Sequence, residues 1–212
     1  MTLICMQYFV KRSILYALPL LMCLYVRAQE PGNLDWHLVK DKNAIKVYTA
    51  PAVSGSLKYI KVDALLDGTL KKFIAVFQNV PDQNKWVYGT ERSYVIKKFS
   101  DHDLIYYNKT KLPWPISDRD AAIHMKIEED NKQTVIITTT GEPTAIPIND
   151  KIVRITHFVG NWTAGDAGNG KIKVRYFIDI DPGGSIPAWI INMFITKGPY
   201  ETLMGLARQL QP

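Results

Sequence analysis

The segment from Gly165 to Lys171 has the spacing of a phosphate-binding loop, G-x-x-x-x-G-K. Such a loop needs Ser or Thr after the lysine to hold Mg²⁺, and it must lead from a strand into a helix whose N-terminal amides bind the phosphate. Here Ile172 follows the lysine, and the chain continues into an alternating polar and apolar segment that is typical of a strand. We therefore predict a glycine-rich β-hairpin at this place and no phosphate site.

Other chemistry-bearing side chains are scattered along the chain. The four histidines lack the spacing of a metal site, and only His124 and His157 could meet, across neighbouring strands. No G-x-S-x-G motif marks a nucleophilic serine. The two cysteines lie at positions 5 and 23, in a segment that we expect to be removed. The sequence therefore predicts no catalytic residue, no metal and no cofactor.

Residues 1–28 have the composition of a secretory signal peptide. Lys11 and Arg12 precede the apolar run ILYALPLLMCLYV, and the segment ends on the small residue Ala28. Thirteen residues at about 1.5 Å each are too short to cross a hydrocarbon core of about 30 Å. We predict cleavage after about Ala28, a secreted or periplasmic protein, and one mature domain over residues 29–212.

The mature chain has an ordinary globular composition. Removal of the leader leaves 23 Lys and Arg against 20 Asp and Glu, a net charge of +3, and no cysteine. This small charge, without long runs of one sign, gives no basis for nucleic-acid binding. The full sequence is 47% hydrophobic, which supplies the core of a single domain. We expect a monomer.

The elements that must position any site are mostly strands. In residues 171–180, Ile172, Val174 and Tyr176 alternate with Lys171 and Lys173, so that one face meets a core and the other meets water. The same pattern, with short polar connections, recurs in residues 45–49, 57–66, 94–99, 104–112, 121–128, 134–140 and 152–162. We predict a curved antiparallel sheet of seven or eight strands.

Two segments instead have helical periodicity, residues 68–79 and the longer stretch 187–210. Gly198-Pro199 interrupts the second one, because proline lacks an N–H group and clashes with the preceding turn, so we expect a kink near Ile195. A long helix across a concave sheet contacts only part of that surface. The space left between them is the candidate ligand site.

Two motifs carry a family resemblance, PWPISDRD at residues 113–120 and DPGGSIPAWIIN at residues 181–192. Together with Trp86 after Pro81-Asp82, with Val153-Arg154 in a late strand, and with Gly198-Pro199-Tyr200, they resemble the START (StAR-related lipid transfer) domain family. The likeness covers about residues 36–210. It implies an α+β helix-grip fold, in which the sheet wraps the C-terminal helix around a tunnel for one lipid or other hydrophobic small molecule, without catalysis.

Nine residues are expected to contact the ligand, from the resemblance and, for those in the C-terminal helix, from their core-facing positions. Which face of the strands lines the tunnel, and so which row of residues 152–162, stays open. They are Trp86, Tyr106, Trp114, Arg119, Arg154, Tyr176, Trp189, Met193 and Phe194. For Arg119 and Arg154, polar contacts that hold the fold together are the alternative interpretation. A cluster around residues 181–187 supplies a turn and the helix start rather than ligand contacts.

Two other functions stay open at this point. One is an enzyme on the same scaffold, similar to polyketide cyclases or dehydratases, which would need titratable groups such as His124, His157, Arg154 and Tyr176 to converge in the tunnel. The other is a protein- or membrane-interaction module whose interior is filled by its own side chains. Transient membrane contact is also expected of a lipid carrier.

Overall fold

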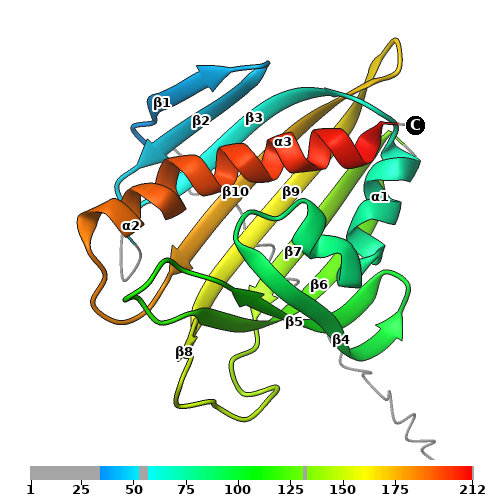
Figure 1. The fold of residues 1–212 in the computed structure, drawn as a ribbon. Helices are drawn as coiled ribbons and strands as arrows, with labels where there is room; N and C mark the ends of the chain where they lie inside the picture. The colour runs from blue at the N-terminus through cyan, green and yellow to red at the C-terminus, as the bar shows by residue number, and fades with distance from the viewer. Residues whose placement is uncertain (1–33, 53–56, 131–132, 212) are drawn as a thin grey trace, which may run out of the picture.

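A curved β-sheet wraps one long helix in the computed structural model, which describes residues 34–52, 57–130 and 133–211 (Figure 1). The predicted leader, residues 1–28, lies outside the described residues. The strands are β1 (His37–Lys42), β2 (Ile45–Ala50), β3 (Tyr59–Asp67), β4 (Thr90–Ser100), β5 (Asp103–Thr110), β6 (Arg119–Asp130), β7 (Thr134–Gly141), β8 (Val153–Arg154), β9 (His157–Gly168) and β10 (Lys171–Asp181). The predicted α+β fold class is confirmed.

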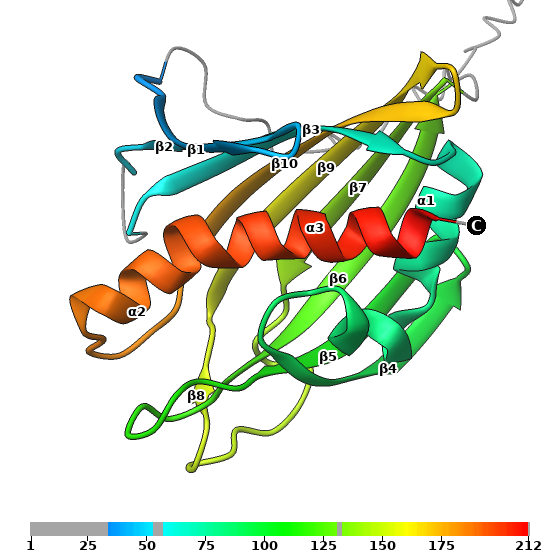
Figure 2. The ribbon, with the colours of Figure 1, turned by 45° about the horizontal axis from the view of Figure 1, so that its top comes forward.

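The strands form one sheet in the order β1-β2-β3-β10-β9-β7-β6-β5-β4, and neighbours along this path pair antiparallel. The short strand β8 instead pairs parallel with the start of β6. Most connections are hairpins, which explains why neighbours in sequence are neighbours in space. Figure 2 shows how the sheet curls below and behind the C-terminal helix.

Strand β10 confirms the predicted alternation, since Ile172, Val174 and Tyr176 are buried while Lys173 and Arg175 are exposed. The glycine-rich segment before it is the β9–β10 hairpin. Its turn residues Asn169 and Gly170 have φ of 53° and 69°, the positive values that a tight two-residue hairpin turn requires. The segment leads into a strand and not into a helix, so it lacks the geometry of a phosphate-binding loop.

The described residues form ten strands, two more than the eight segments that the sequence pattern indicates. Strand β1 was not predicted, because nearly all of its residues are exposed and it has no apolar face to alternate. The predicted strand over residues 152–162 is two strands, β8 and β9, separated by Ile155 and Thr156. Arg154 interrupts the apolar residues of this segment. Its strand β8 pairs with β6, whereas β9 pairs with β7 and β10.

The helices match the two predicted segments. The first is α1 (Leu70–Gln78), capped by the hydroxyl of Thr69, which accepts from the Lys72 amide at 3.2 Å, and a 3₁₀ turn η1 (Val80–Lys85) follows it. The second consists of α2 (Ala188–Asn192), a π-helical stretch η2 (Met193–Lys197) and α3 (Gly198–Leu210). The interruption expected near Ile195 is thus a local change of helix type just before Pro199.

The core lies between the concave face of the sheet and the helices α1 and α3. Phe73 and Phe77 of α1 and Leu203 and Leu206 of α3 are at most 3% exposed and pack against the inward strand residues. Among the described residues, no helix combines the length and the apolar character needed to span a membrane. Helix α3 crosses the concave side of the sheet (Figure 1).

Candidate functional site

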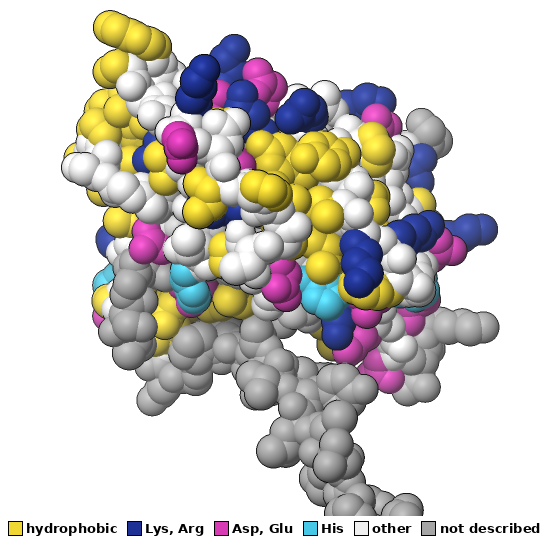
Figure 3. Space-filling view, turned by 90° about the horizontal axis from the view of Figure 1, so that it is seen from below, with side chains coloured by type: hydrophobic (Ala, Val, Ile, Leu, Met, Phe, Trp, Pro, Cys, Tyr) yellow, Lys and Arg dark blue, Asp and Glu magenta, His cyan; other side chains and the backbone are white. Residues whose placement is uncertain are grey.

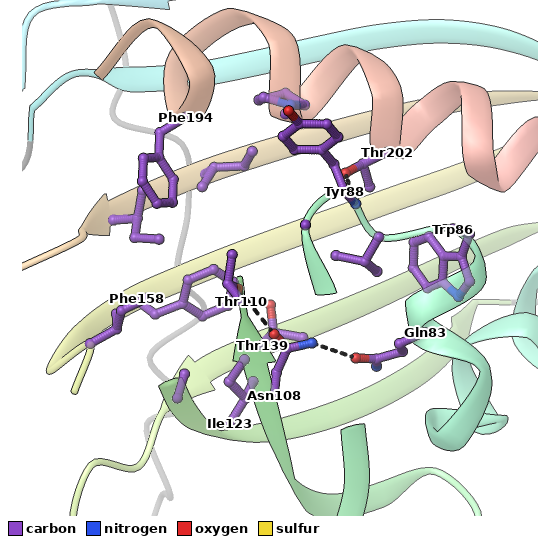
Figure 4. A pocket seen from close by; sticks show the side chains of 18 of the residues that line it. Gln83, Trp86, Tyr88, Asn108, Thr110, Ile123, Thr139, Phe158, Phe194 and Thr202 are labelled. Atoms are coloured by element: carbon purple, nitrogen blue, oxygen red, sulfur yellow. Dashed lines mark hydrogen bonds between the residues drawn. The ribbon is translucent and has the colours of Figure 1, made fainter. Parts of the chain in front are cut away.

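A cavity of about 170 Å³ lies between the sheet, η1 and the junction of η2 with α3. Its walls come from η1 and the following turn, from strands β5, β6, β7, β9 and β10, and from the C-terminal helix. Figure 4 shows Phe194 and Thr202 reaching into this space from the helix and Phe158, Thr139 and Ile123 facing them from the sheet. The predicted space beneath the helix is therefore present, although the protein's own side chains fill part of it.

Aromatic side chains form the wall at the α1 end of the cavity. Trp162 stacks on Tyr176 with ring centroids 3.5 Å apart, and Phe77 packs edge-on against Trp162 at 5.1 Å and Trp86 at 5.0 Å. All four rings are nearly or fully buried. Such contacts fix the rings relative to one another, so this wall is rigid and apolar.

Polar side chains form a second patch on the same wall. The Asn108 amide donates to Gln83 Oε1 at 3.3 Å, and its oxygen accepts from Thr110 Oγ1 at 3.3 Å (Figure 4). The same amide donates to Thr90 Oγ1 at 3.0 Å. Asn108 and Gln83 are buried. Because each amide uses the other as a partner, the patch is satisfied without a ligand.

Two tyrosines complete the polar surface. Burial raises the pKa of Tyr106 to about 12, although a hydrogen bond with Gln83 opposes the shift. Burial also raises the pKa of Tyr176, and the neighbouring Tyr106 adds to that rise. Both phenols are therefore protonated at neutral pH, and they present O–H groups rather than negative charge.

Five of the nine predicted contact residues line this cavity: Trp86, Tyr106, Tyr176, Met193 and Phe194. They come from four different elements or turns that the fold brings together. The other four, Trp114, Arg119, Arg154 and Trp189, do not belong to its lining. Whether any of the nine contacts a ligand stays a prediction.

Arg119 holds two loops together. It is 2% exposed and donates to the carbonyl oxygens of Ser117, Pro182 and Gly183, the last two at 3.3 and 3.1 Å. Burial lowers its pKa from the ordinary arginine value. All of these partners are backbone carbonyls of the loops before β6 and before α2, so Arg119 connects the two motifs that carry the family resemblance. These contacts fit the alternative interpretation of Arg119, polar contacts that hold the fold together.

Arg154 holds a third loop in the same junction. Its Nε donates to Asp120 Oδ1 at 2.6 Å and its Nη2 to Oδ2 at 3.1 Å, and both side chains are at most 5% exposed. The guanidinium also donates to the carbonyls of Pro143, Ile146 and Pro147 in the β7–β8 loop. The hydrogen bond with Asp120 raises the pKa of Arg154 against the opposing effect of burial. Arg154 therefore has no free donor directed at the cavity.

The two predicted tryptophans that do not line the cavity lie near the same end of the molecule. Trp114 is 91% exposed in the β5–β6 loop, in a tight turn that the Ile116 amide closes by donating to the Pro113 carbonyl oxygen at 3.0 Å. Trp189 in α2 is 47% exposed. Its expected inward orientation is wrong, because α2 extends past the edge of the sheet (Figure 2) and Ile190, one residue on, is the buried position.

The polar patch was not predicted. Asn108 shares the inward face of β5 with Tyr106. A polar residue at an inward position of this strand is the signal that would have identified the patch. Gln83 had no such signal, since it follows a helix in a segment without periodicity.

The histidines named for the enzyme alternative lie outside the cavity lining. His124 Nε2 is 2.6 Å from Asp103 Oδ1, and His157 Nε2 is 3.0 Å from Asp179 Oδ2. Within the part of the chain that the structure describes, no three His, Cys, Asp or Glu side chains are grouped to hold a metal. Of the groups that alternative needs, only Tyr176 reaches the cavity.

Comparison with known proteins identifies the family. Residues 22–211 match the model of the START domain, so the chain belongs to the START domain family. It is a START-domain protein of the lipid-transfer type, and the predicted resemblance is confirmed.

Three relatives illustrate the match. An uncharacterized protein of Pseudomonas aeruginosa is 31% identical over 172 residues, covering 81% of this chain and 85% of that protein. The phosphatidylcholine transfer protein of Bos taurus is 24% identical over 195 residues, covering 89% of this chain and 90% of that protein. The crystal structure of a STAR-related lipid transfer protein from Xanthomonas axonopodis has a TM-score of 0.75 and 26% identity, covering 84% of this chain and 99% of that one.

Proposed function

We propose that this protein binds one lipid or other hydrophobic small molecule in the cavity beneath α3 and shields it from water, without catalysis. The observation that carries this proposal is the cavity itself, whose wall is mostly apolar and aromatic and whose polar groups are neutral apart from the exposed Lys111. Burial of apolar surface at about 25 cal/mol per Å² supplies the affinity, and the few buried polar groups supply selectivity. Membership of the START domain family supports the same function.

The size of the cavity limits what it holds as it stands. Its volume of about 170 Å³ is below the range of about 300–1,000 Å³ that is common for sites of drug-sized ligands. A compact or single-chain molecule therefore fits best, and a two-chain lipid requires the helix to move away from the sheet. The π-helical stretch Met193–Lys197 lies in the cavity wall and is the natural place for such a movement.

Filling the cavity is expected to abolish binding. Ile123 faces the cavity from β6 (Figure 4), so the variant Ile123→Trp places a ring where the ligand would lie. We expect the affinity for a fluorescent fatty alcohol to fall at least tenfold, measured by fluorescence titration of purified protein.

Lys126→Trp is the matched control, since Lys126 lies on the same strand and is exposed. It introduces the same side chain outside the cavity and is expected to leave the affinity unchanged. If Ile123→Trp folds with an unchanged melting temperature and binds as tightly as the unchanged protein, the cavity is not the binding site.

We further propose that the end of the molecule carrying α2 docks transiently on membranes. Trp114, Trp189 and Ile148, which is 72% exposed, project from α2 and from two loops that Arg119 and Arg154 fix in place. Figures 1 and 2 place these elements at one end, and the view from below shows hydrophobic side chains gathered at that end (Figure 3). Exposed apolar groups of this kind mark interaction surfaces.

Removing the most exposed tryptophan tests this docking. We expect Trp114→Ala to weaken adsorption to vesicles of phosphatidylcholine and phosphatidylglycerol about tenfold, since burial of one aromatic ring contributes more than about 1.4 kcal/mol. Co-sedimentation with the vesicles measures it. Phe99→Ala removes an aromatic ring that is 53% exposed on β4 and serves as control. Equal adsorption of both variants contradicts docking through this end.

We also propose that residues 1–28 are a signal peptide and that the mature protein is secreted or periplasmic. The proposal is supported by the sequence of this segment, in which basic residues, an apolar run and a small residue follow one another. The intact mass of the protein recovered from the producing cells tests it, because a chain beginning near Gln29 is expected. A chain that retains residues 1–28 would contradict cleavage.

A further inference from the structure

Charged side chains are scarce in the lining of the cavity. Among the described lining residues, none is Asp, Glu, Arg or His, and Lys111 is the one with a charge. Lys111 is exposed to solvent, so its charge is not buried in the cavity. Burial alone would raise the pKa of Asp118, but hydrogen bonds from Lys109 and Leu112 and the charges of Lys109 and Lys111 lower it. The two buried arginines of the junction donate to backbone carbonyls and to Asp120.

An ionised head group buried inside the cavity would consequently have no buried counter-charge among the described lining residues. Moving a charge from water into a protein interior without a partner costs several kcal/mol. Burial already disfavours the charged form of two cavity residues, because it is the main cause of the raised pKa values of Tyr106 and Tyr176. A phosphate or carboxylate placed beside these rings meets the same loss of solvation.

The cavity does contain hydrogen-bond donors. Tyr106 and Tyr176 are buried residues of its wall, and each carries a phenolic O–H that can donate to a ligand. The indole Nε1 of Trp86, also in this wall, is buried without a partner in the described structure. Unpaired buried donors cost about 1–3 kcal/mol each, so an acceptor that reaches them gains that energy.

We propose that the ligand carries an uncharged polar group that accepts hydrogen bonds from Tyr106 and Tyr176, and that lipids with an ionised phosphate or carboxylate are discriminated against. This inference rests on the proposed function, because it concerns the same cavity. It assigns the ligand to the class of alcohols, esters, ketones and similar neutral apolar molecules. It differs from what the name of the Bos taurus relative, a phosphatidylcholine transfer protein, would suggest.

Four probes with one chain length separate the possibilities. Decanol, decanoate, decyl phosphate and decane share the chain and differ in the head group, and each displaces a bound fluorescent fatty alcohol if it enters the cavity. At pH 8, below the concentrations at which micelles form, decanol is expected to bind at least tenfold more tightly than decanoate or decyl phosphate. Decanoate is expected to gain affinity as the pH falls toward the pKa of its carboxyl group, whereas decanol stays constant.

The outcomes distinguish this inference from the proposed function. If decanoate or decyl phosphate binds at least as tightly as decanol, the preference for neutral head groups is overturned while the carrier function stands. If no probe displaces the fluorophore, both are overturned.

Variants of the two tyrosines test the donors directly. In Tyr106→Phe/Tyr176→Phe, decanol is expected to lose about tenfold in affinity while decane is unaffected. The control Tyr107→Phe alters a buried tyrosine on the opposite face of β5, where it stacks on Tyr94, and is expected to change neither. Equal losses for decanol and decane in the double variant would overturn the assigned role of the hydroxyls.

Discussion

Replacing Arg154 by methionine is expected to lower the free energy of unfolding by about 3–5 kcal/mol. The change removes both hydrogen bonds to Asp120, whose side chain is 3% exposed, and leaves that carboxylate buried without its partner. It also releases the carbonyls of Pro143, Ile146 and Pro147, so the β7–β8 loop loses its attachment. Urea unfolding followed by circular dichroism measures the change.

Two companion variants identify the cause of the loss. Arg175→Met removes a similar pair with Asp63, but that arginine side chain is 49% exposed, so the expected cost is below about 1 kcal/mol. Replacing both partners, Arg154→Met with Asp120→Leu, leaves no unpaired buried charge and is expected to be more stable than Arg154→Met alone. If Arg154→Met and Arg175→Met cost the same, the junction does not depend on its buried ion pair.

Gly205→Ala is expected to destabilise the contact between the C-terminal helix and the chain after η1. An added Cβ would lie 2.3 Å from the carbonyl oxygen of Trp86 and 2.8 Å from its Cα. These are backbone atoms, so α3 must move away from the cavity wall. The cost of such overpacking, about 1–3 kcal/mol, exceeds the gain of about 1 kcal/mol that alanine brings to a helix. We expect the melting temperature to fall by about 2–8 °C.

Gly165→Ala is the matched control, because the nearest atom to its added Cβ is the Gln133 carbonyl oxygen at 3.8 Å, an ordinary contact. Its melting temperature is expected to stay within about 2 °C of the unchanged protein. A Gly205→Ala protein as stable as the control would show that α3 does not rest on the Trp86 backbone.

Much of the fold follows from periodicity in the sequence. Strand β10 alternates because one of its faces meets the core and the other meets water. The Gly198-Pro199 pair indicates that the helix changes type in the residues just before it, Met193–Lys197. Strand β1 could not be found this way, because it is exposed on both faces. Strand β8 exists only because residues distant in sequence meet, Val153 with Arg119 and Arg154 with Asp120.

The apolar and aromatic residues of the candidate site could be predicted from the sequence. Its polar patch could not, and two residues of the conspicuous motifs proved to lie outside it. Tyr106 and Tyr176 follow from strand alternation, and Met193 from helical spacing. The conspicuous motif residues Arg119 and Arg154 serve the junction of three loops instead, because a buried guanidinium needs several acceptors and backbone carbonyls supply them. The Gln83–Asn108 contact joins residues 25 positions apart, a distance that no local pattern reports.

Native mass spectrometry of the protein purified from its producing cells tests the central claim most directly. One neutral apolar molecule per chain is expected, released on denaturation and missing from Ile123→Trp but retained by Lys126→Trp. A bare chain in every preparation, together with no uptake of fatty alcohols or other apolar molecules added in solution, would contradict a carrier function for this cavity.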